Sequence, residues 1–194
     1  MSESIAEGPW SGTRFSIIRP LFSLFGRTYR VYSETGELVL FVRHPLFRMR
    51  SEFTLFADEA ETQPLLIVKS RRLLAINMVH DVFEASSGRR LAAVRTRGFS
   101  FLVRDAWDIL DDTDRVAGEM TEEGPYLLRR MMRIIPGQHA IRIGGEETAH
   151  LTQRVRFFAR AFELVLGARP TIDPRFLVAA SILAIMSDVR REES

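Results

Sequence analysis

Hydrophobic and polar residues alternate in short runs along most of this 194-residue chain. Each run ends in a polar segment rich in Gly, Asp, Glu or Ser, and a second alternating run follows it. Alternation interrupted by such turns is typical of β-hairpins. The hairpins predicted in this way pair residues 28–32 with 38–43, 53–57 with 65–70, 80–85 with 90–95, 107–110 with 115–120, and 139–143 with 148–153.

Two further strands are predicted over residues 155–159 and 161–166, which brings the total to about twelve. The first four hairpins begin about 25 residues apart, so the chain has a loose structural repeat. Open sheet edges are costly for a chain with so many short antiparallel strands. The pattern therefore favours a β-sandwich or a closed antiparallel β-barrel.

The end of the chain changes to a helical pattern. Asp173 can cap a helix that starts at Pro174, and the basic residues near its end suit the negative end of the helix dipole. From residue 176 to residue 186 the only polar side chain is Ser181, so the helix is apolar on every face. This stretch rises about 16 Å, roughly half the hydrocarbon thickness of a bilayer. The helix therefore needs protein around it, and a barrel closed around a central helix meets that need.

A second break in the strand pattern predicts a short amphipathic surface helix over residues 125–135. Pro125 fits the first helical position, and Pro136-Gly137 ends the helix. Three arginines share one face of this helix, and apolar side chains fill the opposite face.

Composition supports a mainly β, α+β domain with a substantial core. The chain is 46% hydrophobic and 27% charged, which is typical of a folded protein. We expect residues 14–194 to form a single barrel domain behind a flexible N-terminal tail of residues 1–13. The chain has no Cys, which excludes disulfides, thiolate catalysis and cysteine-ligated zinc. The N-terminus has no signal-peptide pattern, so we expect a cytoplasmic protein.

The charge balance argues against a dedicated nucleic-acid partner, because the formal net charge is only +2. Lys69 is the only Lys, so 26 of the 27 basic residues are Arg. Arg favours bidentate contact with phosphate and carboxylate groups. A general compositional preference for Arg explains the same count without any function.

In their order along the chain, the hairpins over residues 29–42, 53–76 and 80–97 and the helix over residues 172–186 resemble the tubby C-terminal-like group. The resemblance is to its LURP-one-related and phospholipid-scramblase-like branch, and it covers roughly residues 22–190. It implies a twelve-stranded barrel around a hydrophobic C-terminal helix. Tubby-like domains are associated with phosphoinositide binding through surface basic residues, and scramblase-like members with calcium and lipid transfer. This chain has no extended acidic calcium-binding segment, so scramblase activity is not expected.

Basic side chains in two places are the candidate contacts for an anionic headgroup. The first group lies on the predicted amphipathic helix, where each arginine can contribute about 1 kcal/mol at a charged surface. The second group follows a predicted strand and can converge with Arg89 and Arg90 to form a phosphate-binding patch. The alternative is that all of them are solvated charges with no ligand. The candidate residues are Arg129, Arg130, Arg133, Lys69, Arg71 and Arg72.

Metal and catalytic signals are absent from the sequence. Four aspartates lie close together and can supply calcium ligands, but an Asp-rich β-turn explains them more simply. The four histidines show no metal-ligand spacing, although His139 and His150 can face each other across a hairpin. No nucleophile elbow, phosphate loop or dinucleotide motif occurs, so we predict no cofactor and no enzyme activity. The aspartates are Asp108, Asp111, Asp112 and Asp114, and the remaining histidines are His44 and His80.

The sequence therefore predicts a non-catalytic binding module for anionic phospholipid headgroups or a phosphorylated ligand, peripheral to a membrane and without a transmembrane segment. The alternative is a protein-interaction or structural domain with no lipid activity. A third reading, an enzyme with a pocket at the barrel mouth, requires convergent titratable groups that sequence cannot reveal.

Overall fold

The computed structural model describes residues 8–20, 27–44, 52–73, 77–97, 106–124, 137–154, 159–168 and 171–192. These residues form twelve strands and one helix. The elements are β1 (Arg14–Pro20), β2 (Arg27–Tyr32), β3 (Leu38–His44), β4 (Glu52–Phe56), β5 (Pro64–Leu73), β6 (Asn77–Glu84), β7 (Arg90–Thr96), β8 (Ala106–Leu110), β9 (Val116–Glu123), β10 (Gln138–Ile143), β11 (Glu146–Arg154), β12 (Ala159–Leu166) and α2 (Pro174–Glu192).

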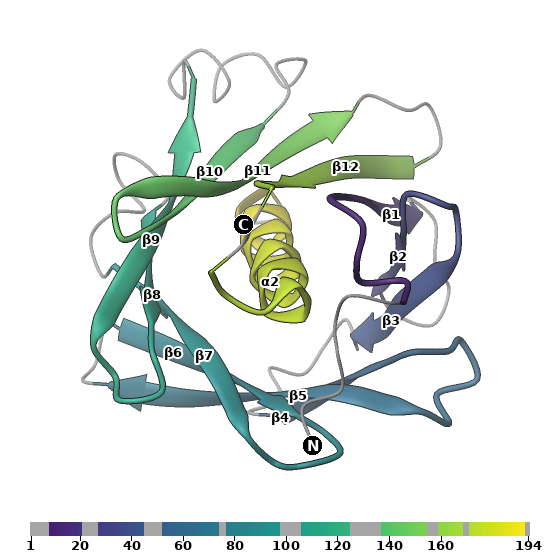
Figure 1. The fold of residues 1–194 in the computed structure, drawn as a ribbon, viewed down its shortest axis with the longest axis horizontal. Helices are drawn as coiled ribbons and strands as arrows, with labels where there is room; N and C mark the ends of the chain where they lie inside the picture. The colour runs from purple at the N-terminus through teal and green to yellow at the C-terminus, as the bar shows by residue number, and fades with distance from the viewer. Residues whose placement is uncertain are drawn as a thin grey trace.

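The strands form a closed barrel in which each strand pairs with its neighbours in the chain (Figure 1). All pairings are antiparallel, and β1 closes the barrel against β12 in a register that runs from Arg14 opposite Val165 to Pro20 opposite Ala159. The closed antiparallel barrel predicted from the alternation is confirmed. Closure leaves no open sheet edge, so the backbone groups of β1 and β12 pair with each other.

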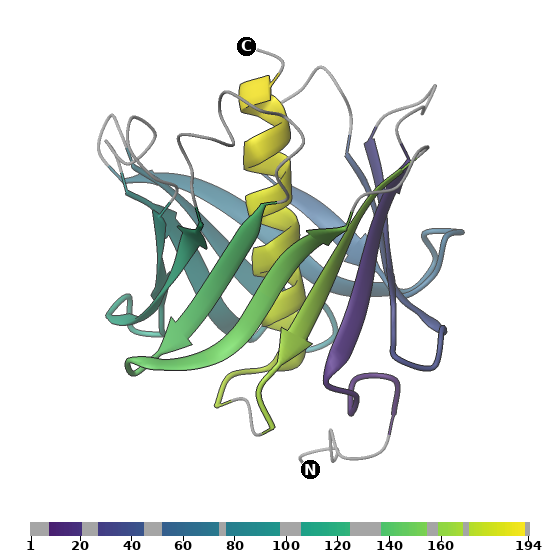
Figure 2. The same cartoon turned by 90° about the horizontal axis from the view of Figure 1, so that it is seen from above.

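The helix α2 lies inside the barrel and runs along it (Figures 1 and 2). Between Phe176 and Met186 every residue is buried except Leu183, which is partly buried and packs on the same core. Ser181, the one polar residue of this stretch, donates its hydroxyl to the Leu177 carbonyl at 2.8 Å. The predicted central helix is confirmed, and its single polar group has a hydrogen-bond partner. Across the described residues, no helix combines the length and apolar character needed to cross a membrane.

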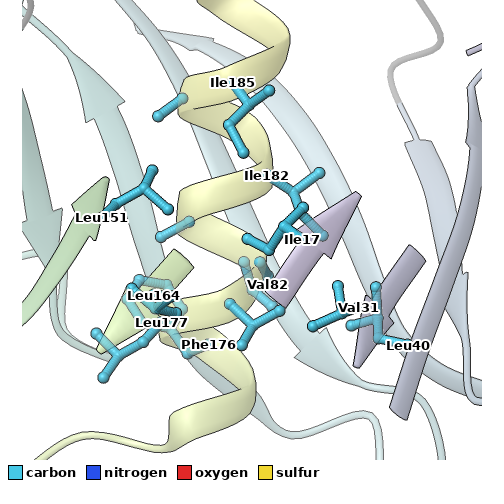
Figure 3. Close-up of a cluster of buried hydrophobic side chains, with 14 of the residues drawn as sticks. Ile17, Val31, Leu40, Val82, Leu151, Leu164, Phe176, Leu177, Ile182 and Ile185 are labelled. Atoms are coloured by element: carbon cyan, nitrogen blue, oxygen red, sulfur yellow. The ribbon is translucent and has the colours of Figure 1, made fainter. Parts of the chain in front are cut away.

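Alternation within the strands supplies the wall around α2. Successive side chains of a strand point to opposite faces, so every second residue faces the helix. Figure 3 shows Ile17, Leu151 and Leu164 from the wall beside Leu177 and Ile182 of α2. All five side chains are buried to 1% exposure or less and belong to one apolar cluster. The core of the protein is therefore the contact between the helix and the inner face of the barrel.

The start of α2 is tied to the barrel by charge. Asp173 caps the helix, as the sequence predicts, by accepting a hydrogen bond from the Arg175 backbone N–H at 2.9 Å. The Arg175 guanidinium contacts Asp173 and also Glu84 at the end of β6, where an Nη1–Oε1 distance of 2.8 Å separates the two side chains. Hydrogen bonds from Ser87 and from Arg175 hold the pKa of Glu84 below its usual value. This contact fixes the helix N-terminus to the β6–β7 hairpin.

Two features of the fold differ from the sequence prediction. The alternation does not predict β1, because Arg19 and Pro20 interrupt its apolar run, yet β1 is the strand that closes the barrel. The sequence places residues 1–13 in a tail, but Trp10 packs against the core with its ring 5.5 Å from that of Phe15, and the Thr13 carbonyl accepts the Leu166 N–H at 2.7 Å.

The helix predicted over residues 125–135 lies outside the described residues, as does most of the strand predicted over residues 155–159. The described residues hold twelve strands, and β1 is the one among them that the alternation does not predict.

We expect Glu84→Gln to lower the free energy of unfolding by about 1–2 kcal/mol at neutral pH, since it weakens a charge-assisted bond to Arg175. A lowered folded-state pKa means that this stabilisation is fully present above the ordinary Glu pKa of about 4.3, and is lost as the pH falls through the lowered value. Urea unfolding from neutral to acidic pH measures the difference between wild type and variant. If the stability difference between wild type and variant stays constant or widens in acid, the stabilising role of the Glu84–Arg175 contact is contradicted.

Candidate functional site

Two arginines and two aspartates form a network on the outer face of the barrel. Arg71 of β5 contacts Asp81 of β6 at 2.7 Å and Asp114 of the β8–β9 turn at 2.6 Å. Arg90, at the start of β7, contacts the same two carboxylates at 2.7 and 2.6 Å. The hydrogen bond from Arg90 lowers the pKa of Asp114, and the bond to Asp81 raises the pKa of Arg71. Asp114 and Arg71 are therefore held in their charged forms.

A second network of the same kind lies beside it on β7, β8 and β9. Arg95 and Arg97 both contact Asp108, and Arg97 also reaches Glu119 with an Nη2–Oε2 distance of 3.0 Å. The hydrogen bond to Asp108 raises the pKa of Arg97. The Asp108 side chain is only 8% exposed, so it depends on these two partners. Arginines and carboxylates are equal in number in each network.

The structure brings part of the predicted phosphate patch together. Arg71 and Arg90 do converge, but Asp81 and Asp114 lie between them. Lys69 lies on the same outer face and contacts Glu52 at 3.4 Å, with both side chains about half exposed. Carboxylates thus already occupy the place that the sequence reading gave to a phosphate. Arg129, Arg130, Arg133 and the side chain of Arg72 lie outside the described residues.

Two exposed arginines share one carboxylate on the outer face of β1, β11 and β12. Arg14 and Arg154 share a single carboxylate, Glu163, with Nε–Oε distances of 3.6 and 3.0 Å. The two arginine side chains are 57% and 61% exposed. Val165, the register partner of Arg14, is one of the large apolar residues that the structure leaves exposed. We call Arg14, Arg154, Glu163 and Val165 the β1–β12 patch.

Three more arginines point to the inside of the barrel. Arg19, Arg27 and Arg160 follow the alternation of core residues in β1, β2 and β12, so they face inward. We call them the rim arginines. The three strands are neighbours in the barrel, and Arg19 is the direct register partner of Arg160. The end of β1 and the starts of β2 and β12, which carry these residues, lie at the end of the barrel where α2 finishes (Figure 2).

Reasoning from the sequence identified neither the β1–β12 patch nor the rim arginines. The rim arginines do carry a recognisable pattern, because each lies two residues from an apolar position that faces the core. Arg14 and Arg154 gave no signal, since they are far apart in sequence and come together only through the pairing of β11, β12 and β1.

The four clustered aspartates support the turn interpretation. Asp111 accepts hydrogen bonds from the Thr113 and Arg115 backbone N–H groups at 2.8 and 2.9 Å, which closes the β8–β9 turn. Asp108 and Asp114 are engaged by arginines, as described above. Among the described residues, no group of three or more His, Asp or Glu side chains can hold a metal ion.

The histidines lie in separate environments. His139 is buried beside Trp107, with ring centroids 5.7 Å apart, whereas His150 is half-buried and lies 3.6 Å from Glu147. They are not register partners, because His139 lies opposite Leu151, so the suggested facing pair does not form. His80 bonds to Ser70 through Nδ1 at 2.8 Å, and the side chain of His44 lies outside the described residues.

Comparison with known proteins identifies the fold. An X-ray structure of a protein from Arabidopsis thaliana is similar to this chain with a TM-score of 0.52 and 17% sequence identity. The match covers 94% of this chain and 96% of the plant protein. No family model matches the chain, and no curated protein matches it in sequence. A likeness at this level of identity shows that the two proteins share a fold over the matched part of the chain.

We expect Asp108→Asn to lower the free energy of unfolding by about 2 kcal/mol or more, because Arg95 and Arg97 then share no buried carboxylate. Glu52→Gln is the matched control, since it breaks the exposed pair with Lys69 and should cost less than about 0.5 kcal/mol. Urea unfolding of both variants at neutral pH gives the comparison. Equal losses of stability in the two variants would show that the Asp108 network stabilises the protein no more than an exposed ion pair does.

Proposed function

We propose that this protein is a non-catalytic binding module that contacts anionic phospholipid headgroups through the outer face of its barrel. The observation that carries the proposal is the β1–β12 patch, where two highly exposed arginines share one carboxylate beside an exposed valine. A soluble phosphorylated ligand carries the same anionic group. It is the alternative ligand within this proposal, and the test below distinguishes it from a lipid headgroup.

The chemistry of the patch suits a membrane surface. A guanidinium forms paired hydrogen bonds with a phosphate, and each basic residue near an anionic surface contributes about 1 kcal/mol. Val165, the register partner of Arg14, adds a small apolar contact beside that charge, as is common where a protein meets lipid headgroups. The two networks on β5–β9 are less suited, because each of their arginines already holds a carboxylate.

The basic residues proposed from the sequence differ in how readily they can bind a lipid phosphate. Lys69 is exposed and paired only at the surface with Glu52, so it can exchange that partner for a lipid phosphate at little cost. Arg71 would first have to leave Asp81 and Asp114. The arginines of the segment 125–135 and Arg72 remain part of the proposed surface.

We also propose that the chain belongs to the LURP-one-related and phospholipid-scramblase-like branch of the tubby C-terminal-like group. The support is the order of hairpins with a terminal buried helix, together with the barrel shared with the plant protein. As part of the same proposal, we place the protein in the cytoplasm at the surface of a membrane.

Vesicle co-sedimentation tests the function. At low salt we expect the protein to pellet with vesicles that contain phosphatidylserine and to stay in solution with pure phosphatidylcholine. Added salt should weaken binding, because exposed charges are screened. Arg14→Gln and Arg154→Gln should each weaken it about fivefold, the equivalent of about 1 kcal/mol.

Arg43→Gln is the matched control, because it removes the same charge from an exposed outer position that is paired one-to-one with Glu61. Binding that is equal on neutral and anionic vesicles removes the lipid proposal. Competition by a soluble phosphate ester at matched ionic strength indicates the phosphorylated-ligand variant instead.

A further inference from the structure

The barrel wall has its shortest backbone pairing between β3 and β4. Among the described residues these neighbouring strands share a single register pair, Phe41 opposite Phe56. Every other pair of neighbouring strands has at least three register pairs among the described residues. A β-bulge between Leu55 and Phe56 bends β4 at the point where it meets β3. We call the junction of β3 with β4 the seam.

An aromatic ring on the outer side of the seam is covered by two arginines. Phe41 alternates with the core residues Leu40 and Val42, so its side chain faces outward, yet it is fully buried. The Cζ atoms of Arg30 and Arg43 lie 5.5 and 5.6 Å from the centre of its ring. Cation–π contacts of this kind favour the folded arrangement. The two guanidinium groups are therefore held beside the one register pair that joins β3 to β4.

Two ion pairs cross the seam from these arginines. Arg30 of β2 forms paired hydrogen bonds with Glu59, at 2.9 Å from Nε and 2.7 Å from Nη2. Arg43 of β3 lies 3.2 Å from Glu61, measured from Nη1 to Oε1. Both glutamates belong to the β4–β5 turn, which lies beside β3 (Figure 1). The hydrogen bond from Arg30 holds the pKa of Glu59 below its usual value. We call these two ion pairs the latch.

The β4–β5 turn has its own hydrogen bonds, which fix the position of both carboxylates. Asp58 accepts hydrogen bonds from the Thr62 and Gln63 backbone N–H groups, both at 3.0 Å. The Ala57 N–H donates to the Gln63 carbonyl at 2.9 Å. Glu61 adopts a φ of 59°, a left-handed conformation that is uncommon outside glycine. A turn that is already ordered loses little conformational entropy when its carboxylates meet the two arginines.

We propose that the barrel opens locally at the seam, and that the latch sets how often it opens. Separation of any other neighbouring strands breaks a longer ladder of backbone pairs, so local opening favours the seam. Opening uncovers Val42 and Phe53, which belong to the apolar cluster around α2. The helix keeps its own hydrogen bonds in this state. The interior beside α2 is thus reached from outside without unfolding of the domain.

Cysteine labelling tests the seam, because the chain has no Cys and one introduced thiol reports on one position. Val42→Cys places the thiol on the inner face of β3. Val82→Cys on β6 is the matched control, since both valines are fully buried in the same cluster. With an uncharged maleimide under native conditions, we expect Val42→Cys to react at least about tenfold faster, the equivalent of about 1.4 kcal/mol. Urea unfolding of both variants shows whether their global stabilities match.

Removal of a latch carboxylate tests the control of opening. Glu59→Gln should raise the labelling rate of Val42→Cys about fivefold, and added salt should also raise it, because the latch is partly exposed and its charges are screened. Neither change should accelerate the labelling of Val82→Cys by as much. Glu52→Gln is the matched control, since it removes a carboxylate from β4 whose partner Lys69 lies on β5 and not across the seam.

Two results overturn the proposal. Equal labelling rates for Val42→Cys and Val82→Cys, at equal global stability, show that the seam opens no more often than the rest of the wall. Equal effects of Glu59→Gln and Glu52→Gln on the rate show that the latch does not control opening. If Val42→Cys does not fold, Leu55→Cys on the other side of the seam replaces it, with the equally buried Leu151→Cys as its control.

Discussion

A helix without a polar side has to be enclosed by other apolar groups, and this requirement organises the molecule. Between Phe176 and Met186 the helix α2 exposes almost nothing to solvent. Twelve strands meet the requirement by closing into a barrel whose inner positions are apolar along most of the helix. Closure depends on the pairing of β1 with β12, the two strands most distant in sequence. The helix and the closure of the barrel therefore depend on each other.

This arrangement decides where binding can occur. Because α2 and the inner side chains fill most of the interior, the outer face and the ends of the barrel remain for ligands. On β5–β9 the outer arginines are neutralised by carboxylates such as Asp81 and Asp108, which stabilise the sheet across neighbouring strands. At the β1–β12 patch two exposed arginines share a single carboxylate, Glu163.

Local sequence patterns predict much of the fold but little of the candidate site. Alternation and turn chemistry predict five hairpins within a few residues of their observed bounds, and Asp173 marks the start of α2. The strand β1 escapes this reasoning, since Arg19 reads as an interruption unless the inward direction of its neighbours is known. Ion pairs such as that of Arg71 with Asp114 join distant segments, so only the register of the sheet reveals them. Sequence therefore names the charged residues but not their partners.

Native-state hydrogen exchange of the α2 amides tests the central claim most directly. If the helix is the enclosed core of the barrel, the amides from Val178 to Ile185 exchange only when the whole domain unfolds. Their exchange free energies then equal the global free energy of unfolding and match those of buried strand residues such as Val31 and Val68. Exchange of the helix amides at a clearly lower free energy than the strand amides would show that α2 leaves an intact barrel, and would contradict the account.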